Sequence, residues 1–478
     1  MADSTPPPSK KQRRKEKKAR WLAERKALEM TSGNGSIQRK RRNRRQNRTS
    51  VSVRPSPTVH YQVCTSTTCA NRLAGRNCII RSIAPYLHCF EVFVKGRWTG
   101  CSVGKVLMNE FPTLSSAYCA RVVQLGLFRV NGSRTSLDSV LQSGDFLQHF
   151  KHRHEPSLHV PVQEFYNVAK EAPVSTTWIH FETNEMIVVN KPSGVPVHPT
   201  GRFQYNSLTH ILQHDRRESA GENEIETRKL FPVHRLDRLT SGLLLLAKTA
   251  EKARSLSAEL TANASMEKPA SRVMQKYYVA RVKGEFPDEK DGFEMLRSKL
   301  VTIETARDNF WRVTASIGLK SPRQGHVRCV TEAVDSKPCV TLMRRRGKAG
   351  KNESIVECLL VTGRTHQIRV HLQHLGFPIV NDPLYGSVPK ENVTKSTVVV
   401  QASTESNEGG DTTESFTDNE VHEQHCINAC DVCTAEKEGI SLIEEEDTVL
   451  CLHSYRYESP TWSFQVPLPL WAQDESIT

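Results

Sequence analysis

The sequence predicts a mixed α/β fold, because strand-like and helix-like patterns alternate through its central part. Between about 175 and 390, strands are expected at the apolar runs EMIVVNK, GLLLLAK, YYVARV and SIVECLLV, with helical stretches between them. A shorter pattern of two helices and two strands precedes them over 84–155, and residues 1–55 have little apolar content from which to build a core. We therefore expect a disordered basic arm (1–55), a small module (84–155) and a main domain (175–472).

The small module is expected to combine two helices with a β-ribbon. SVGKVLMNEF places Val106 and Leu107 on an apolar helix face, and Gly126 can end the second helix, SSAYCARVVQLG. LFRVNGS and LQSGDFLQHF follow as short strands with glycine turns. The module leads into KHRHEP, where we expect Lys151 and Arg153 to contact phosphate; the alternative is a packing domain whose exit is basic by accident.

Charge is distributed unevenly along the chain. The 478 residues include 66 Lys and Arg against 52 Asp and Glu. Residues 1–50 carry a net +13, residues 391–450 a net −13 and residues 451–478 a net −2, which for a total of +14 leaves +16 in residues 51–390. A folded region with that excess of positive charge favours a polyanionic partner, because neutralising phosphates releases condensed counterions. Nucleic acid is the expected partner.

Residues 391–449 are dense in Ser, Thr, Glu and Asp, and the apolar pattern returns only in HSYRYESPTWSFQVPLPLWA. This composition predicts an acidic, disordered insertion within the main domain. Inside it, compact Cys/His spacing of the kind that can bind zinc is formed by His422, His425, Cys426, Cys430 and Cys433. No second, distant Cys or His pair completes a standard zinc finger in the sequence, so we predict no metal site.

The cellular setting is inferred from what the composition disfavours. No stretch approaches the roughly 18 to 20 apolar residues needed to span a bilayer, and no apolar secretory segment begins the sequence. Thirteen scattered cysteines fit reduced thiols better than a disulfide framework. We expect a monomer without membrane contact in the nucleus or cytoplasm; a mitochondrial location is less favoured because no clean amphipathic stripe precedes Glu16.

The segment HRLDRLTSGLLLLAK places Asp237 among His234, Arg235 and Arg238, just ahead of a buried-type strand. Nearby cations lower the pKa of a carboxyl group and keep it ionised. An ionised carboxylate on a loop beside a rigid strand can act as a nucleophile or a base, and its cationic neighbours can hold RNA phosphates. The alternative is a structural salt-bridge cluster.

The segment TGRTHQIRVHLQHLG predicts a short helix that Thr365 caps and Gly376 ends. Its core face is expected to consist of Ile368, Leu372 and Leu375, and another face of His366, Arg369 and Gln373. That second face could present Arg369 to a carboxylate in a cleft, with Arg364 and His366 as further RNA contacts. Taken alone, the segment would be an ordinary amphipathic helix.

In QKYYVARVKG, the two-residue period of a strand puts Tyr278 on one face with Ala280 and Val282. A tyrosine on the inward face can stack on a nucleobase.

Together with VVNKPSGVPVHPTG and GFPIVNDPLYG, these three segments resemble the RluA-type family of pseudouridine synthases, over roughly 84–390 and 450–472. The resemblance implies a pseudouridine synthase fold with a mainly antiparallel central sheet, and isomerisation of uridine to pseudouridine in RNA without metal or organic cofactor. By the same resemblance Asp237 is the catalytic residue, Tyr278 is the motif tyrosine, and Arg369 pairs with the catalytic Asp.

VKGRWTG and HRHEP are similar to the eukaryotic branch of this family, which implies tRNA as substrate, notably its anticodon loop, with mRNA or rRNA as further candidates. Asp237 would start cleavage of the glycosidic bond, either by attacking the sugar or base or by removing a ribose proton. Tyr278 would stack on the uracil and could pass on the carbon 5 proton, and Arg235 would fill the gap left by the flipped base. The competing hypothesis is a non-catalytic RNA-binding or ribosome-assembly protein that keeps the fold for its basic surface.

Overall fold

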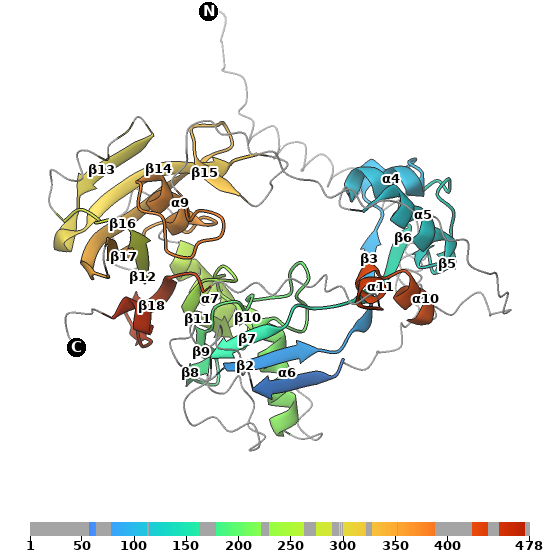
Figure 1. Ribbon diagram of the computed structural model, residues 1–478, viewed down its shortest axis with the longest axis horizontal. Coiled ribbons are helices and arrows are strands. Elements are labelled where there is room, and N and C mark those ends of the chain that lie inside the picture. Colours follow the sequence, from blue (N-terminus) through green and yellow to red (C-terminus); the bar gives the residue numbers. More distant parts are fainter. Residues whose placement is uncertain are drawn as a thin grey trace, which may run out of the picture. The chain divides into compact units, whose positions relative to one another are not determined.

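The structure is a computed structural model (Figure 1). It describes residues 57–63, 78–111, 114–161, 178–220, 229–261, 274–288, 296, 298, 300–321, 327–350, 352–387, 423–437 and 449–473. Two compact units are distinguished: the first contains Leu87–His152 and the described part of Thr413–Cys430, and the second contains the described parts of Pro57–Tyr86, Arg153–Thr412 and Asp431–Thr478. The predicted basic arm lies outside the described residues.

The first unit packs the two predicted helices on a four-stranded sheet, which has two more strands than the predicted ribbon. Helices α4 (Val103–Glu110) and α5 (Ser116–Gln124) begin at Ser102 and Ser115, whose side chains accept hydrogen bonds from backbone N–H groups in the first turn. The sheet has the strand order β3-β6-β4-β5, formed by Tyr86–Phe93, Phe146–Arg153, Phe128–Val130 and Ser133–Arg134. A short 3₁₀ helix, η1 (Gly96–Trp98), precedes α4.

The acidic segment differs from the prediction of an insertion without packed structure. Residues 423–437 form α10 (Glu423–Asn428) and α11 (Asp431–Lys437). Cys426 and Ala429 are buried in the same hydrophobic cluster as the core of α4 and α5. The Arg121 guanidinium donates a hydrogen bond to the Ala429 carbonyl at 3.1 Å. A few small apolar residues therefore give this part of an acidic segment a place in a core; its remaining residues lie outside the described ranges.

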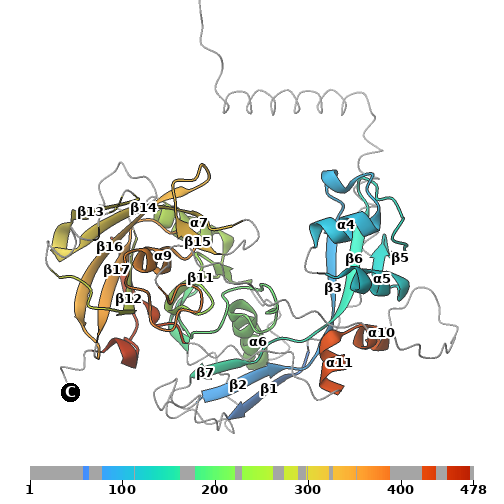
Figure 2. The same ribbon diagram turned by 45° about the horizontal axis from the view of Figure 1, so that its top comes forward.

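The second unit is built on a twelve-stranded sheet with the order β13-β14-β16-β17-β12-β18-β11-β9-β8, to which β10, β15 and β19 are attached (Figures 1 and 2). Its strands are β8 (Ile179–Glu182), β9 (Met186–Lys191), β10 (Phe231–Pro232), β11 (Ser241–Ala247), β12 (Gln275–Lys283), β13 (Val301–Thr305), β14 (Trp311–Leu319), β15 (Arg328–Val330), β16 (Lys337–Lys348), β17 (Glu353–Leu360), β18 (Leu452–Ser459) and β19 (Trp462–Gln465).

Pairing within this sheet is antiparallel except between β11 and β18, which run parallel. Strands β9, β11, β12 and β17 confirm the four predicted apolar runs. A separate antiparallel sheet in this unit has the order β1-β2-β7, from Val59–Val63, Cys78–Ile83 and Leu158–Pro161. The fold is therefore mixed α/β with a mainly antiparallel central sheet.

The apolar run of β11 is continuous because both of its faces are buried. Leu244 and Leu246 belong to the cluster that contains residues of α6 (Leu208–Ala220) and α9 (Gln367–His374), and Leu243 and Leu245 belong to the cluster that contains Leu256 of α7 (Ala250–Thr261). Helix α9 packs on β14, β15 and β16 (Figure 1). Helices thus cover both faces of the sheet, which excludes water from its centre.

Two short 3₁₀ helices complete the second unit, η5 (Arg307–Asn309) before β14 and η7 (Leu470–Ala472) after β19. In the part of the chain that the structure describes, every helix is too short or too polar to cross a bilayer.

Candidate active site

Asp237 lies in the loop that connects β10 to β11. Leu236 and Leu239 flank it and are buried, and the Thr240 N–H donates to the Asp237 carbonyl at 3.1 Å. The Asp237 side chain is 19% exposed. The carboxylate therefore stands on a loop that its own neighbours anchor in the core, directly before a buried strand, as the sequence predicts.

A buried lysine fixes the backbone next to Asp237. Lys191, at the end of β9, is fully buried, and its ammonium donates to the carbonyls of Pro192 (2.9 Å), Val195 (2.8 Å) and Arg238 (3.0 Å). Burial lowers the pKa of Lys191 to about 7, and the negative charge of Asp237 acts in the opposite direction. Three carbonyl oxygens match the three N–H bonds of an ammonium group, so this arrangement stabilises the charged form.

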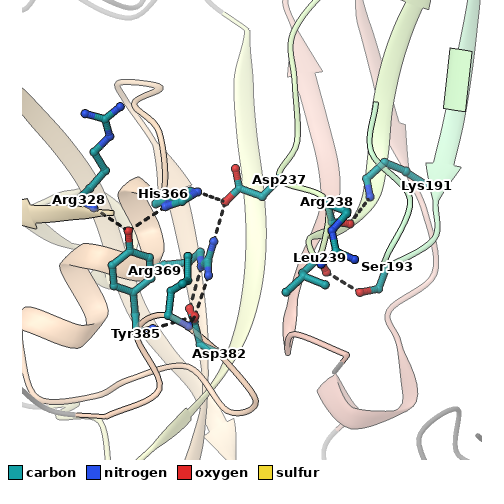
Figure 3. Close-up of polar contacts among 11 residues, drawn as sticks. Lys191, Ser193, Asp237, Arg238, Leu239, Arg328, His366, Arg369, Asp382 and Tyr385 are labelled. Atoms are coloured by element: carbon teal, nitrogen blue, oxygen red, sulfur yellow. Dashed lines mark hydrogen bonds and ion pairs between the residues drawn. The ribbon is translucent and has the colours of Figure 1, made fainter. Parts of the chain in front are cut away.

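Two more bonds connect the β9 loop to the same backbone. The Gly194 N–H donates to the Arg238 carbonyl at 2.9 Å. The Ser193 hydroxyl donates to the Leu239 carbonyl at 2.6 Å, a bond that Figure 3 shows. Together with Lys191 they hold the two residues that follow Asp237. Positioning of this kind restricts where the carboxylate can point, which is a requirement of a reacting group.

Arg369, on α9, lies between two carboxylates. Its Nη1 donates to Asp237 Oδ2 at 3.1 Å, and its Nε and Nη2 donate to Asp382 Oδ2 and Oδ1 at 2.8 and 2.7 Å (Figure 3). Burial lowers the pKa of Arg369, but its hydrogen bonds to Asp382 and the charges of Asp382 and Asp237 raise it by more, so the pKa lies above its usual value. The guanidinium is therefore a permanent cation for both carboxylates.

The two carboxylates are bound very differently. Asp382 has a fully buried side chain and accepts two hydrogen bonds from Arg369 and two more from the backbone N–H groups of Leu384 and Tyr385, each at 2.9 Å. Asp237 accepts one hydrogen bond from Arg369, at Oδ2. Among the residues that the structure describes, Oδ1 of Asp237 has no hydrogen-bond partner, and Figure 3 shows it directed away from Arg369.

His366 is the second neighbour of Asp237. Its Nε2 lies 3.6 Å from Asp237 Oδ2, and its Nδ1 lies 2.8 Å from the Tyr385 hydroxyl, whose oxygen accepts the Arg328 N–H at 2.9 Å. This pattern assigns the hydroxyl proton to Nδ1 and leaves the Nε2–H facing Asp237. Burial lowers the pKa of His366 despite the opposing charge of Asp237, so the ring is neutral.

The start of α9 differs from the prediction that Thr365 caps it. The cap residue is His366, which adopts a left-handed conformation (φ 59°, ψ 20°) and provides no side-chain cap. The Gln367 side chain instead accepts hydrogen bonds from the Arg364 N–H (3.0 Å) and the Thr362 hydroxyl (2.9 Å). The left-handed conformation of His366 directs its ring toward Asp237 and Tyr385. The local sequence did not predict this conformation.

Tyr278 occupies the predicted face of β12. It shares one buried cluster with Ala280 and Val282, and its hydroxyl lies 3.5 Å from the Tyr457 hydroxyl. Burial raises the pKa of Tyr278 to about 12, and the negative charge of Asp237 adds to the shift. Tyr278 is therefore a neutral phenol within the electrostatic reach of Asp237.

Comparison with known proteins identifies the family. A family model described as RNA pseudouridylate synthase matches residues 185–374, a range that contains Asp237, Tyr278 and Arg369. Pseudouridylate synthase RPUSD2 of Mus musculus is 31% identical over 456 residues, which cover 83% of this chain and 72% of the mouse protein. The chain belongs to the RNA pseudouridylate synthase family. As a member of its RluA-type branch, it is an RNA pseudouridine synthase, an isomerase.

Two further relatives come from Saccharomyces cerevisiae. The tRNA pseudouridine(31) synthase is 30% identical and covers 82% of this chain and 96% of its own length. The mitochondrial tRNA pseudouridine(32) synthase is 34% identical over 64% of this chain and 55% of its own length. Among solved structures, human RNA pseudouridylate synthase domain containing 4 is 19% identical, with a TM-score of 0.36 over 63% of this chain and 92% of the human chain.

Two residues that were predicted to hold RNA phosphate, His234 and Arg153, have contacts within the protein, and their RNA contact stays a prediction. Burial lowers the pKa of His234 to about 3, so its ring is neutral, and it packs edge-on against Tyr457 with ring centroids 5.2 Å apart. Arg153 is buried, and its guanidinium donates to the Gly201 carbonyl at 2.6 Å. His234 as a whole is half-buried and Arg153 is buried, and the local sequence does not reveal the partners of either residue.

The other predicted RNA contacts remain accessible to different degrees. Arg235 and Lys151 are exposed, and the Lys151 ammonium lies 5.6 Å from the centre of the Tyr118 ring. Arg238 and Arg364 are half-buried, and the Arg238 guanidinium lies 5.3 Å from the centre of the Phe203 ring. RNA contact by these four residues stays a prediction.

Sequence reasoning missed four residues that support the site: Lys191, Ser193, Asp382 and Tyr385. All four lie in the segments VVNKPSG and GFPIVNDPLYG, which were used only for the family resemblance. Asp382 carried a usable signal, because a carboxylate within an apolar segment needs a cationic partner when it is buried. No local pattern pointed to Lys191, whose three acceptors are backbone carbonyls.

Proposed function

We propose that this synthase converts uridine to pseudouridine in tRNA, in or beside the anticodon loop, with Asp237 as its catalytic residue. The observation that carries the proposal is the asymmetric binding of the Asp237 carboxylate. Arg369 holds Oδ2 at 3.1 Å, and Oδ1 has no partner among the described residues. The names of the two yeast relatives, both tRNA pseudouridine synthases, support the choice of tRNA.

The reaction requires that the bond between ribose and uracil N1 breaks and that a bond to carbon 5 replaces it. An ionised carboxylate can start this either by attacking the sugar or base or by removing a ribose proton. Either route needs a free oxygen lone pair, which Asp237 Oδ1 has. Arg369 serves both routes, because its guanidinium binds and orients one carboxylate oxygen without occupying the second.

Asp382 has no free oxygen for the reaction, and the same hydrogen bonds that occupy its oxygens give it a structural role. Its two oxygens accept two bonds from Arg369 and two from the backbone, and its side chain is fully buried. Asp382 thus acts as a positioning residue that fixes the Arg369 guanidinium. His366 is a second positioning residue, because its neutral Nε2–H faces Asp237 Oδ2.

Tyr278 is proposed to pack against the uracil while it is detached and turned. An aromatic ring favours such a contact at every orientation of the base, because each base presents a π-face. With a pKa raised to about 12, the phenol is not a base at neutral pH, so its packing rather than its ionisation carries the role. The exposed Arg235, two residues before Asp237, is proposed to occupy the gap that the flipped base leaves.

The proposal is tested with purified full-length chain and a tRNA transcript whose uridines carry a carbon 5 tritium label. We expect tritium release and new pseudouridine in the anticodon region with the wild type, and neither product above background with Asp237→Asn, a loss of at least about 10⁴-fold. The control is Asp335→Asn, which removes an exposed carboxylate elsewhere and should retain full activity.

RNA affinity, measured by filter binding, should be nearly equal for Asp237→Asn and the wild type. If wild-type protein binds RNA but forms no pseudouridine in any cellular RNA fraction, the non-catalytic RNA-binding hypothesis replaces this proposal. If product forms only in mRNA or rRNA, the activity stands and the choice of tRNA is wrong.

A further inference from the structure

Two short segments outside the reaction site bring four metal-binding side chains together. His152 and His154 lie at the end of β6, and Cys430 and Cys433 lie where α10 gives way to α11. The ligand atoms of these four residues all lie within 4.8 Å of one another. His152 and Cys430 are buried, and His154 and Cys433 are half-buried.

The local geometry holds each histidine to one cysteine. Cys433 Sγ lies 3.2 Å from His154 Nε2, and Cys430 Sγ lies 4.0 Å from the backbone oxygen of His152. One residue separates the two histidines and two separate the cysteines. These short spacings keep the two halves of the set close, because one or two intervening residues extend only a few ångströms.

We propose that His152, His154, Cys430 and Cys433 bind one zinc ion. Two imidazole nitrogens and two thiolate sulfurs form the Cys₂His₂ set that zinc takes in tetrahedral structural sites. Hard cations such as Mg²⁺ and Ca²⁺ require oxygen ligands, which this set does not contain. Four protein ligands complete the tetrahedron, so the zinc has a structural role.

The structure identifies the second pair of ligands that sequence reasoning did not find. The segment HEQHCINACDVC offered one Cys pair without a distant partner, and the partner is the His pair of KHRHEP. His422 and the side chain of His425 lie outside the described residues, and the set of four ligands comes from the residues that are described. Cys426 packs in the hydrophobic cluster around α4 and α5 instead.

A zinc ion at this position explains how an acidic segment with few apolar residues becomes ordered. Among the side chains of residues 423–437 that the structure describes, the small ones of Cys426 and Ala429 are those that join that cluster. Binding free energy from a metal that the unfolded chain cannot hold is folding free energy, and it compensates for a small core. The zinc would fasten these helices to the end of β6.

The test measures zinc in the full-length chain, expressed with zinc in the medium, freed of any purification tag and dialysed against metal-free buffer. We expect one zinc per chain by mass spectrometry. Cys430→Ser/Cys433→Ser should hold less than a tenth of that amount. The matched control, Cys101→Ser/Cys329→Ser, removes two half-buried cysteines outside the set and should retain one zinc per chain.

Further measurements keep the proposal testable if the double variant fails to fold. His154→Ala should lose most of the zinc, and His154→Cys should restore it, because a thiolate replaces the imidazole as ligand. Protein expressed in medium with Co²⁺ in place of zinc should show the intense visible absorption of tetrahedral Co²⁺ with thiolate ligands. Wild-type protein with less than a tenth of a zinc per chain, or zinc that persists in Cys430→Ser/Cys433→Ser, would overturn the proposal.

Discussion

Two loops of the second unit each offer a carboxylate to Arg369, and their difference separates reactivity from support. The loop after β10 presents Asp237 with one hydrogen bond from the guanidinium and a side chain that is 19% exposed. The loop after α9 presents Asp382 with four hydrogen bonds and a fully buried side chain. The same cation thus leaves one carboxylate free to react and makes the other part of the framework.

The two loops also differ in how hydrogen bonds involve their backbone. In the loop of Asp237, the bonds from Lys191, Ser193 and Gly194 reach backbone carbonyls and leave the carboxylate free. In the loop of Asp382, backbone N–H groups bind the carboxylate itself. A reacting group can therefore be positioned through its backbone, whereas a supporting group is positioned through its side chain.

The largest loss of activity is expected when Arg369, the cation that both carboxylates share, is replaced. Arg369→Lys should lower kcat/KM by roughly 10³-fold, because an ammonium cannot make the bidentate contact with Asp382 and reach Asp237 as well. Kinetics on the same tRNA transcript measure this, with Arg254→Lys, an exposed residue of α7, as the control. Activity within threefold of wild type would show that the three-point contact is dispensable.

Asp382→Asn should reduce both stability and activity. The variant leaves the buried Arg369 with one carboxylate fewer, which costs about 3 kcal/mol of unfolding free energy. We expect kcat/KM to fall by about 10²-fold because the guanidinium loses its alignment. Urea unfolding and kinetics measure the two effects, and unchanged stability together with total inactivity would indicate that Asp382 reacts directly.

The smallest effect is expected at Tyr278 and concerns pH. Because burial raises the pKa of Tyr278 to about 12, its hydroxyl keeps its proton well above the ordinary tyrosine range. Tyr278→Phe should therefore retain at least about a tenth of the activity, with the same dependence of kcat/KM on pH between about 6 and 10. Loss of an alkaline decline in the variant, or a fall of more than about 10²-fold, would assign proton transfer to the phenol.

Sequence reasoning succeeded where a feature depends on residues close together in the chain. The buried strands β9, β11, β12 and β17 and the helices α4 and α5 follow from apolar periodicity, and the Ile368, Leu372 and Leu375 face of α9 follows in the same way. The candidate roles of Asp237, Tyr278 and Arg369 followed from motifs and resemblance. The structure adds that Arg369 contacts Asp237 and that the negative charge of Asp237 acts on the Tyr278 hydroxyl.

It could not identify partners that lie far away in the chain. Arg153 was predicted to be a phosphate contact because it lies in a basic cluster, and no local pattern showed that its guanidinium donates to the carbonyl of Gly201, 48 positions away. Helix α10 lies in an acidic segment, and its packing depends on a cluster formed by residues far earlier in the chain. The positioning role of Asp382 follows from its hydrogen bonds with Arg369, which the sequence does not show.

The most direct test of the account is a map of pseudouridine in total RNA from cells whose only copy of this protein carries Asp237→Asn, compared with wild-type cells. The account predicts that specific tRNA sites in or beside the anticodon loop lose their pseudouridine in the mutant, while the protein level and its RNA binding are maintained. Identical maps from the two cell lines, with RNA binding retained, would contradict the assignment of Asp237 and favour a non-catalytic RNA-binding protein.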